Sequence, residues 1–175
     1  SGRWAMDDRY FALLKDFGIE ADCSHTPGVS WEHAAGETMM GSDYSAVQNN
    51  PSFINNILEI PMTIRRTHIS RKGSVKHKLR VLIQGDNVWL RPASATADEM
   101  LRLCKCVNAD PSVDYLEFML HSSELMPNGS PYFKDENAIE ELYITIEKVF
   151  AYAKQLGYEG VTMSQYCKAY KNRNR

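Results

Sequence analysis

Segments typical of β-strands alternate with amphipathic helices along this chain of 175 residues, and no other feature limits its fold so strongly. The strand-like segments are residues 19–24, 56–64, 88–92 and 113–120. The predicted helices are residues 8–17, 96–106, 135–156 and 162–170. Helices that repeatedly follow strands predict an α/β fold with a mainly parallel sheet. The 43% share of hydrophobic residues is enough for a core, so we expect residues 1–170 to form a single domain and residues 171–175 to form a frayed tail.

Local signals mark the ends of the predicted helices. Thr96 followed by Glu99 has the spacing of a capping box, in which each side chain binds the other residue's backbone N–H. Thr162 is a typical N-cap for the last helix. Gly18 and Gly157 follow the last apolar residues of two helices, where glycine commonly ends a helix. These signals predict the boundaries from neighbouring residues alone.

Charge is unevenly distributed along the chain. The net charge of −2 gives no reason to expect a nucleic-acid partner. Residues 65–80, however, hold seven of the 20 Lys and Arg residues and no Asp or Glu, which leaves 13 basic against 22 acidic residues elsewhere, a net charge of −9. Such a run usually forms a solvated loop. The alternative is a contact with an anionic partner such as an acidic glycan.

The cysteines and the hydropathy pattern limit the cellular setting. The four cysteines form no CxxC pair and no zinc-finger spacing, so we interpret them as reduced thiols, which favours a reducing compartment such as the cytoplasm. No apolar stretch approaches the roughly 18 residues that a membrane-spanning helix needs. We therefore expect no membrane span.

The apolar segment "YLEFML" ends at a single imidazole, His121. In α/β folds with parallel strands, reactive side chains gather at the carboxyl ends of the strands, where loops enclose the substrate. His121 is therefore a candidate proton donor at the mouth of an active site. The alternative is a structural histidine whose ring is satisfied by the backbone near the rim of the sheet.

Asp22 and Trp31 form the second candidate group, in the segment "ADCSHTPGVSW". A carboxylate at the end of a strand can hold an imidazole in one tautomer and make it a better acid near neutral pH. The alternative is that Asp22 caps the turn of residues 24–28. Residues 26–51 have no hydrophobic period and are rich in Gly, Ser, Pro and Asn, so we expect Trp31 to lie in a long loop.

Metal ligands and nucleophiles have weaker support. The chain contains no H-x-x-x-H or H-E-x-x-H motif, although His25, His33 and Asp22 could converge in three dimensions. It also lacks the G-x-S-x-G motif of a serine nucleophile.

Two segments resemble the bacterial polysaccharide deacetylases, the chitin-deacetylase-like carbohydrate esterases. "SGRWAMDDRYFALLKDFGIEADCSHTPGVSW" is similar to the middle of that family, where an arginine motif precedes a helix, a glycine, and a strand with D-x-S and a downstream tryptophan. "EFMLHSSELMPNGSPYF" is similar to its last motif, a leucine beside a histidine. A long helix and a closing T-x-x-x-Y helix follow in both. The resemblance covers most of the chain.

The resemblance implies a fold and a chemistry. The fold would be part of a distorted (β/α) barrel. The family removes acetyl groups from sugars with a divalent metal, commonly zinc, that activates a water. Carried over by position, His121 would be the general acid and Asp22 the carboxylate that tunes it. Trp31 and Leu120 would bind the carbohydrate substrate.

The arginine motif falls on Arg3 and Trp4, which the resemblance also assigns to substrate binding. The family's Asp-Asp motif and its H-x-x-x-H metal motif precede these segments and do not occur in this sequence. We therefore expect this chain to be the carboxyl-terminal half of a deacetylase domain, with the N-terminal strands and the metal ligands supplied elsewhere. Its open strand edges would be covered by the missing half or by self-association.

Two alternatives belong to other functional classes. A non-catalytic glycan-binding module would keep the cleft and its aromatic side chains without the chemistry. A barrel glycosidase would need two carboxylates on either side of one glycosidic bond, and Asp22, Glu117 and Glu124 are the candidates.

Overall fold

The structure, a computed structural model, describes residue 6 and residues 8–33, 41–69 and 74–174. Arg3 and Trp4 lie outside the described residues. Short strands and longer helices both occur, which confirms a mixed α/β composition. The chain divides into two compact units, unit 1 (Ser1–Met62 with Glu159–Arg175) and unit 2 (Thr63–Tyr158). The prediction that residues 1–170 form one domain stays a prediction.

A three-stranded sheet is the centre of unit 1. Strand β3 (Ile57–Glu59) pairs in parallel with β1 (Ala21–Asp22) and antiparallel with β2 (Ser52–Ile54). The turn between β2 and β3 consists of Asn55 and Asn56, whose φ angles of 49° and 69° are left-handed. Asparagine tolerates this conformation, which two-residue hairpin turns require. The Asn-Asn pair therefore makes a tight hairpin here.

Two helices accompany the sheet of unit 1. Helix α1 (Asp8–Asp16) places Phe11 and Leu14 against Ile57 of β3, and these three side chains form a buried apolar cluster. Helix α5 (Met163–Arg173) lies beside β1. Removing these side chains from water is the main favourable contribution to folding of this unit.

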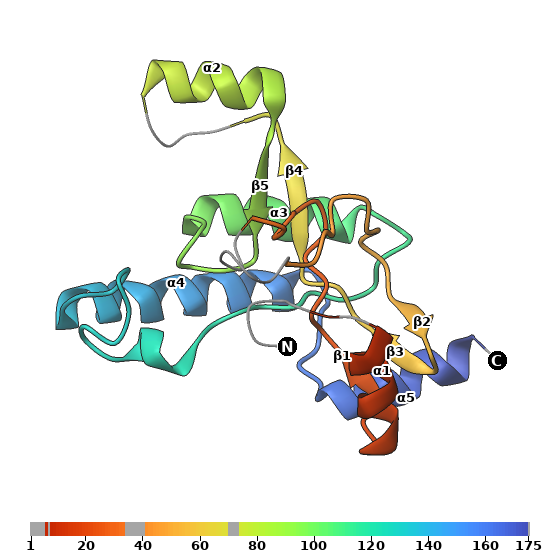
Figure 1. Cartoon of the computed structure of the whole chain (residues 1–175). Coiled ribbons are helices and arrows are strands. Elements are labelled where there is room, and N and C mark those ends of the chain that lie inside the picture. Colours follow the sequence, from red (N-terminus) through yellow and green to blue (C-terminus); the bar gives the residue numbers. More distant parts are fainter. Residues whose placement is uncertain (1–5, 7, 34–40, 70–73, 175) are drawn as a thin grey trace. The chain divides into compact units, whose positions relative to one another are not determined.

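The described residues of unit 2 form a two-stranded ribbon, three α-helices and a short 3₁₀-helix (Figure 1). Strands β4 (Ile64–Thr67) and β5 (Asp86–Trp89) pair antiparallel, and helix α2 (Val75–Gln84) lies between them in sequence. Helix α3 (Ala97–Asn108) packs against β5 and against helix α4 (Glu136–Gln155).

The buried faces of α3 and α4 repeat at helical spacing. Met100, Leu103 and Val107 are buried on α3, and Leu142 and Val149 are buried on α4. Side chains three, four or seven positions apart lie on one side of a helix, so each helix presents one apolar stripe. The core of unit 2 follows directly from this pattern.

The predicted helix ends are confirmed. Thr96 and Glu99 form a reciprocal capping box at the start of α3, as predicted. Thr162 caps α5 in the same way, with Gln165 as the reciprocal residue. Gly157 follows α4 with a left-handed φ of 93°. Such signals are reliable because they depend on neighbours within one turn.

The predicted mainly parallel sheet is wrong. Among the described residues, β1–β3 is the one parallel pairing, while β2–β3 and β4–β5 are antiparallel. The local reason is the hairpin turn between β2 and β3, which reverses the chain within two residues. A parallel crossover would need a dozen or more residues.

The predicted strand at residues 113–120 is also wrong, because this segment joins no sheet. The backbone N–H of Glu117 donates to the hydroxyl of Thr63 at 2.8 Å. Two residues later, the N–H of Met119 donates to the carbonyl of Leu90 at 3.1 Å. The segment keeps the two-residue spacing of a strand, but a side chain takes the place of one backbone acceptor. A continuous ladder therefore does not form.

The interpretation of residues 65–80 as a solvated loop is wrong for its described part. Most of β4 and the first residues of α2 lie in this range.

In the described part of the chain, no helix is both long and apolar enough to cross a membrane.

Candidate functional site

The predicted site residues divide between the two units. Asp22 and Trp31 belong to unit 1, whereas Leu120 and His121 belong to unit 2. The pairing of Asp22 with His121 therefore stays a prediction, and the surroundings of each residue are described within its own unit.

In unit 1, two carboxylates stand side by side at the carboxyl ends of parallel strands. Asp22 ends β1 and Glu59 ends β3, and the two residues are direct partners in the register. Asp22 accepts hydrogen bonds from the hydroxyl of Tyr10 at 3.3 Å and from the backbone N–H of Ser24 at 3.0 Å. The second contact is the turn cap given above as the alternative role of Asp22, and it is confirmed.

Glu59 was not identified from the sequence. Its side chain is 0% exposed, and its Oε1 accepts the backbone N–H of His25 at 2.8 Å. The Nδ1 atom of the same histidine lies 3.9 Å from this oxygen. A buried carboxylate needs such partners, because desolvation of a charge is expensive. The available signal was a single acid in the otherwise apolar segment "ILEIPM".

Aromatic rings enclose His25. Its ring centroid lies 4.8 Å from that of Tyr44 and 6.4 Å from that of Phe11, in an edge-on arrangement with the latter. Burial lowers the pKa of His25, although the negative charge of Asp22 acts in the opposite direction. Burial also raises the pKa of Tyr10, whose phenol therefore stays protonated as a hydrogen-bond donor.

Trp31 lies in the predicted loop of residues 26–51 and is half-buried. Its indole N–H donates to the hydroxyl of Thr26 at 2.8 Å, and its backbone N–H donates to the carbonyl of Ser42 at 2.9 Å. These bonds fix the ring against the start of its own loop. Its assignment as a substrate-binding aromatic stays a prediction.

In unit 2, His121 directly precedes the short 3₁₀-helix η2 (Ser122–Leu125). Its backbone N–H donates to Oε2 of Glu124 at 3.3 Å, and its carbonyl accepts the N–H of the same residue at 2.9 Å. His121 is exposed, so its imidazole is accessible to a bound ligand. Leu120, the preceding residue, is half-buried.

A buried ion pair holds the 3₁₀ turn that follows His121 in place. Glu124, which is 1% exposed, accepts from Arg91 at 2.7 Å, and the Arg91 side chain is 17% exposed. The same guanidinium lies 5.8 Å from the centre of the Tyr132 ring. The two charged residues are 33 positions apart, so no local pattern could reveal the pair. Its engagement with Arg91 also makes Glu124 a poor candidate for a glycosidase acid.

The described residues do not fit a metal centre. No group of three His, Cys, Asp or Glu side chains in that part of the chain could hold a metal ion, and His25, His33 and Asp22 do not form one. No step through a metal can therefore be derived from these side chains.

None of the protein-family models, curated proteins or solved structures that were compared with the chain matches it.

Proposed function

We propose that the complete protein is a metal-dependent deacetylase of an acetylated polysaccharide or amino sugar, and that this chain provides the general-acid half of its site. The observation that supports the proposal most is the exposed imidazole of His121 beside a turn that a buried ion pair holds in place. The order of the motifs in the sequence supports it as well.

His121 would act on the leaving group. When water adds to the acetyl carbon, a tetrahedral intermediate forms, and its C–N or C–O bond to the sugar must break. The imidazolium of His121 donates its proton to that nitrogen or oxygen, so the sugar leaves as a neutral amine or alcohol and the acetyl group leaves as acetate. General acids of this kind contribute about 10²- to 10⁴-fold to the rate.

The accompanying roles are proposals that rest on the resemblance. Asp22 would orient and tune the acid, which requires the carboxylate and the imidazole to approach each other in the complete protein. Trp31 and Leu120 would line the sugar site, together with Arg3 and Trp4. Oδ2 of Asp22 accepts the backbone N–H of Ser24, while Oδ1 of Asp22 accepts the hydroxyl of Tyr10 at 3.3 Å.

The metal ion, its ligands and the remaining strands would come from the other half of the domain. A zinc or similar ion would activate the water, and its ligands would come from the N-terminal half of a partial (β/α) barrel of the deacetylase type. That half, or a second copy of the chain, would also cover the open strand edges.

Acetate release from an acetylated chitooligosaccharide tests the proposal. The chain of residues 1–175, with added zinc, is expected to release no acetate above the blank, whereas the complete protein releases it. Robust turnover by the chain alone would refute the division of the site. A complete protein that binds the oligosaccharide but releases no acetate would support the glycan-binding alternative, and new reducing ends would support a glycosidase.

A further inference from the structure

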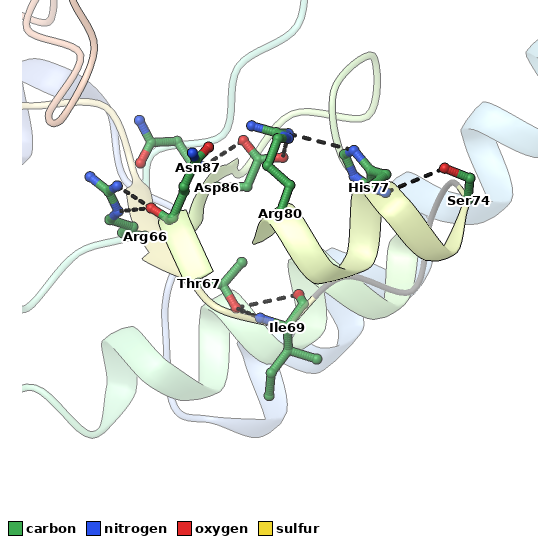
Figure 2. Close-up of polar contacts among 9 residues, drawn as sticks. Arg66, Thr67, Ile69, Ser74, His77, Arg80, Asp86 and Asn87 are labelled. Atoms are coloured by element: carbon green, nitrogen blue, oxygen red, sulfur yellow. Dashed lines mark hydrogen bonds and ion pairs between the residues drawn. The ribbon is translucent and has the colours of Figure 1, made fainter. Parts of the chain in front are cut away.

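Helix α2 is a preformed element between the strands of the β4–β5 ribbon, and Figure 1 shows it at the end of that ribbon. The hydroxyl of Ser74 accepts the N–H of His77 at 3.3 Å at its start, and Figure 2 shows this cap. At its end, the N–H of Gly85 donates to the carbonyl of Val81 at 2.8 Å. A helix that is already folded loses little conformational entropy when it binds a partner.

Two contacts attach the C-terminal end of α2 to β4 and to the residue that follows it. The guanidinium of Arg66 on β4 donates to the carbonyl of Gln84, with an Nε–O distance of 3.1 Å. The Nδ1 atom of His68 lies 3.1 Å from the carbonyl of Leu82. Within α2, Val81 is fully buried. Val81 therefore marks the buried side of the helix, and the side opposite to it faces solvent.

The solvent-facing side of α2 is aliphatic. Val75 is 85% exposed, and Leu79, Leu82 and Ile83 are each more than half exposed. Their spacing of four, seven and eight positions places them on one helix face. Contiguous exposed apolar patches on a soluble protein commonly mark an interaction site. We call these four side chains the apolar face of α2.

Positive charge borders the apolar face of α2. At about 100° per residue, Lys76 falls on one side of this face and Lys78 on the other. Both side chains are exposed, and neither makes an ion pair with any residue that the structure describes. Arg80 lies farther round the helix, where Asp86 partly neutralises it at 3.8 Å (Figure 2). The helix itself contains no acidic residue.

We propose that α2 binds the surface of an anionic lipid bilayer. The apolar face enters the boundary between headgroups and acyl chains, and the ammonium groups of Lys76 and Lys78 reach the lipid phosphates while their methylene stems cover apolar surface. An aliphatic face with flanking lysines is the composition of interfacial helices. Because α2 contains no acidic residue, no charge within the helix opposes the attraction to anionic lipid.

Two other occupants fit the same face less well. An acidic glycan would interact with the lysines but would leave the aliphatic side chains in water, and α2 contains no Trp, Tyr or Phe ring for a sugar to stack on. In a symmetric contact with a second copy, the lysines of each α2 would face those of its partner. Like charges in such a contact are unfavourable.

Vesicle co-sedimentation of the chain of residues 1–175 tests the proposal. Binding is expected for vesicles of phosphatidylcholine with phosphatidylserine and should be much weaker for phosphatidylcholine alone. The double variant Lys76→Gln/Lys78→Gln should lower the partition coefficient about 25-fold, at about fivefold for each lysine. Leu79→Gln/Ile83→Gln should lower it by at least about tenfold, because polar groups replace the inserted side chains.

Matched controls keep the result specific. Ile144→Gln changes an exposed apolar residue on α4, and Lys105→Gln changes an exposed lysine on α3, so neither should alter binding. Circular dichroism checks that each variant is folded. The proposal is overturned if wild-type protein ignores anionic vesicles. It is equally overturned if Leu79→Gln/Ile83→Gln binds anionic vesicles as wild type does, because α2 would then be a general site for polyanions. It is also overturned if these two substitutions abolish self-association of the chain and leave vesicle binding unchanged.

Discussion

The ion pair between Arg91 and Glu124, the latter close to His121 in the sequence, permits a quantitative prediction. Replacing Glu124 with leucine leaves the charge of Arg91 without its partner in a mostly buried position. Breaking a buried pair by removing one member typically destabilises a protein by about 3–5 kcal/mol. Because the Arg91 side chain keeps 17% exposure, water can partly compensate for the loss. We therefore expect the free energy of unfolding to fall by about 3 kcal/mol.

The double variant Arg91→Met/Glu124→Leu separates the effect of an unpaired buried charge on Arg91 from the effect of altered packing. It removes both charges and leaves none buried, so it should be less destabilised than Glu124→Leu alone, by about 1–2 kcal/mol. Urea unfolding followed by circular dichroism measures each free energy. Glu20→Leu is the matched control, because its ion pair with Lys171 is on the surface, and it should change stability by less than about 1 kcal/mol.

Two outcomes would contradict this role of the buried ion pair. If Glu124→Leu were no more destabilised than Glu20→Leu, the buried pair would not hold the turn that carries His121. If the double variant were as unstable as Glu124→Leu alone, the loss would come from packing and not from an unpaired charge.

Three further predictions concern the cores and titratable groups. Leu58, which is 0% exposed in β3, should cost about 2–5 kcal/mol of stability when changed to alanine, as measured by urea unfolding. Because burial lowers the pKa of His25 in the folded protein, the unfolded state takes up its proton first as pH falls below 6.5. The free energy of unfolding of the wild type should therefore decrease between pH 6.5 and the pKa of His25 in the folded protein. The decrease should be smaller in His25→Asn, and an equal decrease in both proteins would contradict the burial of this ring. Burial raises the pKa of Cys104 to about 11, so iodoacetamide should label the exposed Cys106 in native protein and Cys104 only after unfolding, as mass spectrometry can show.

The helices could be predicted because their signals are local. Thr96 with Glu99 and Thr162 with Gln165 satisfy backbone N–H groups within one turn, whatever the rest of the chain does. Helix α2 shows the limit of this approach. Its cap, Ser74, lies inside a strongly basic run, and a run of like charges is more typical of a solvated loop than of a helix.

The sheets and the sites depended on pairings between distant residues. The hairpin turn of Asn55 and Asn56 was a readable signal that two strands run antiparallel. Nothing near residues 113–120 indicates that the hydroxyl of Thr63 accepts one of their backbone N–H groups. The pairing of Arg91 with Glu124 is hidden for the same reason, since only the folded chain brings the two together.

The proposed role of His121 as general acid makes the rate of the complete protein depend on whether the leaving group needs a proton. His121→Ala should slow acetate release from an acetylated chitooligosaccharide by about 10²- to 10⁴-fold with zinc content unchanged. The same variant should hydrolyse p-nitrophenyl acetate nearly as fast as wild type, because p-nitrophenolate leaves without a proton. Equal losses on both substrates, or a loss of zinc, would contradict the assignment of His121 as the general acid.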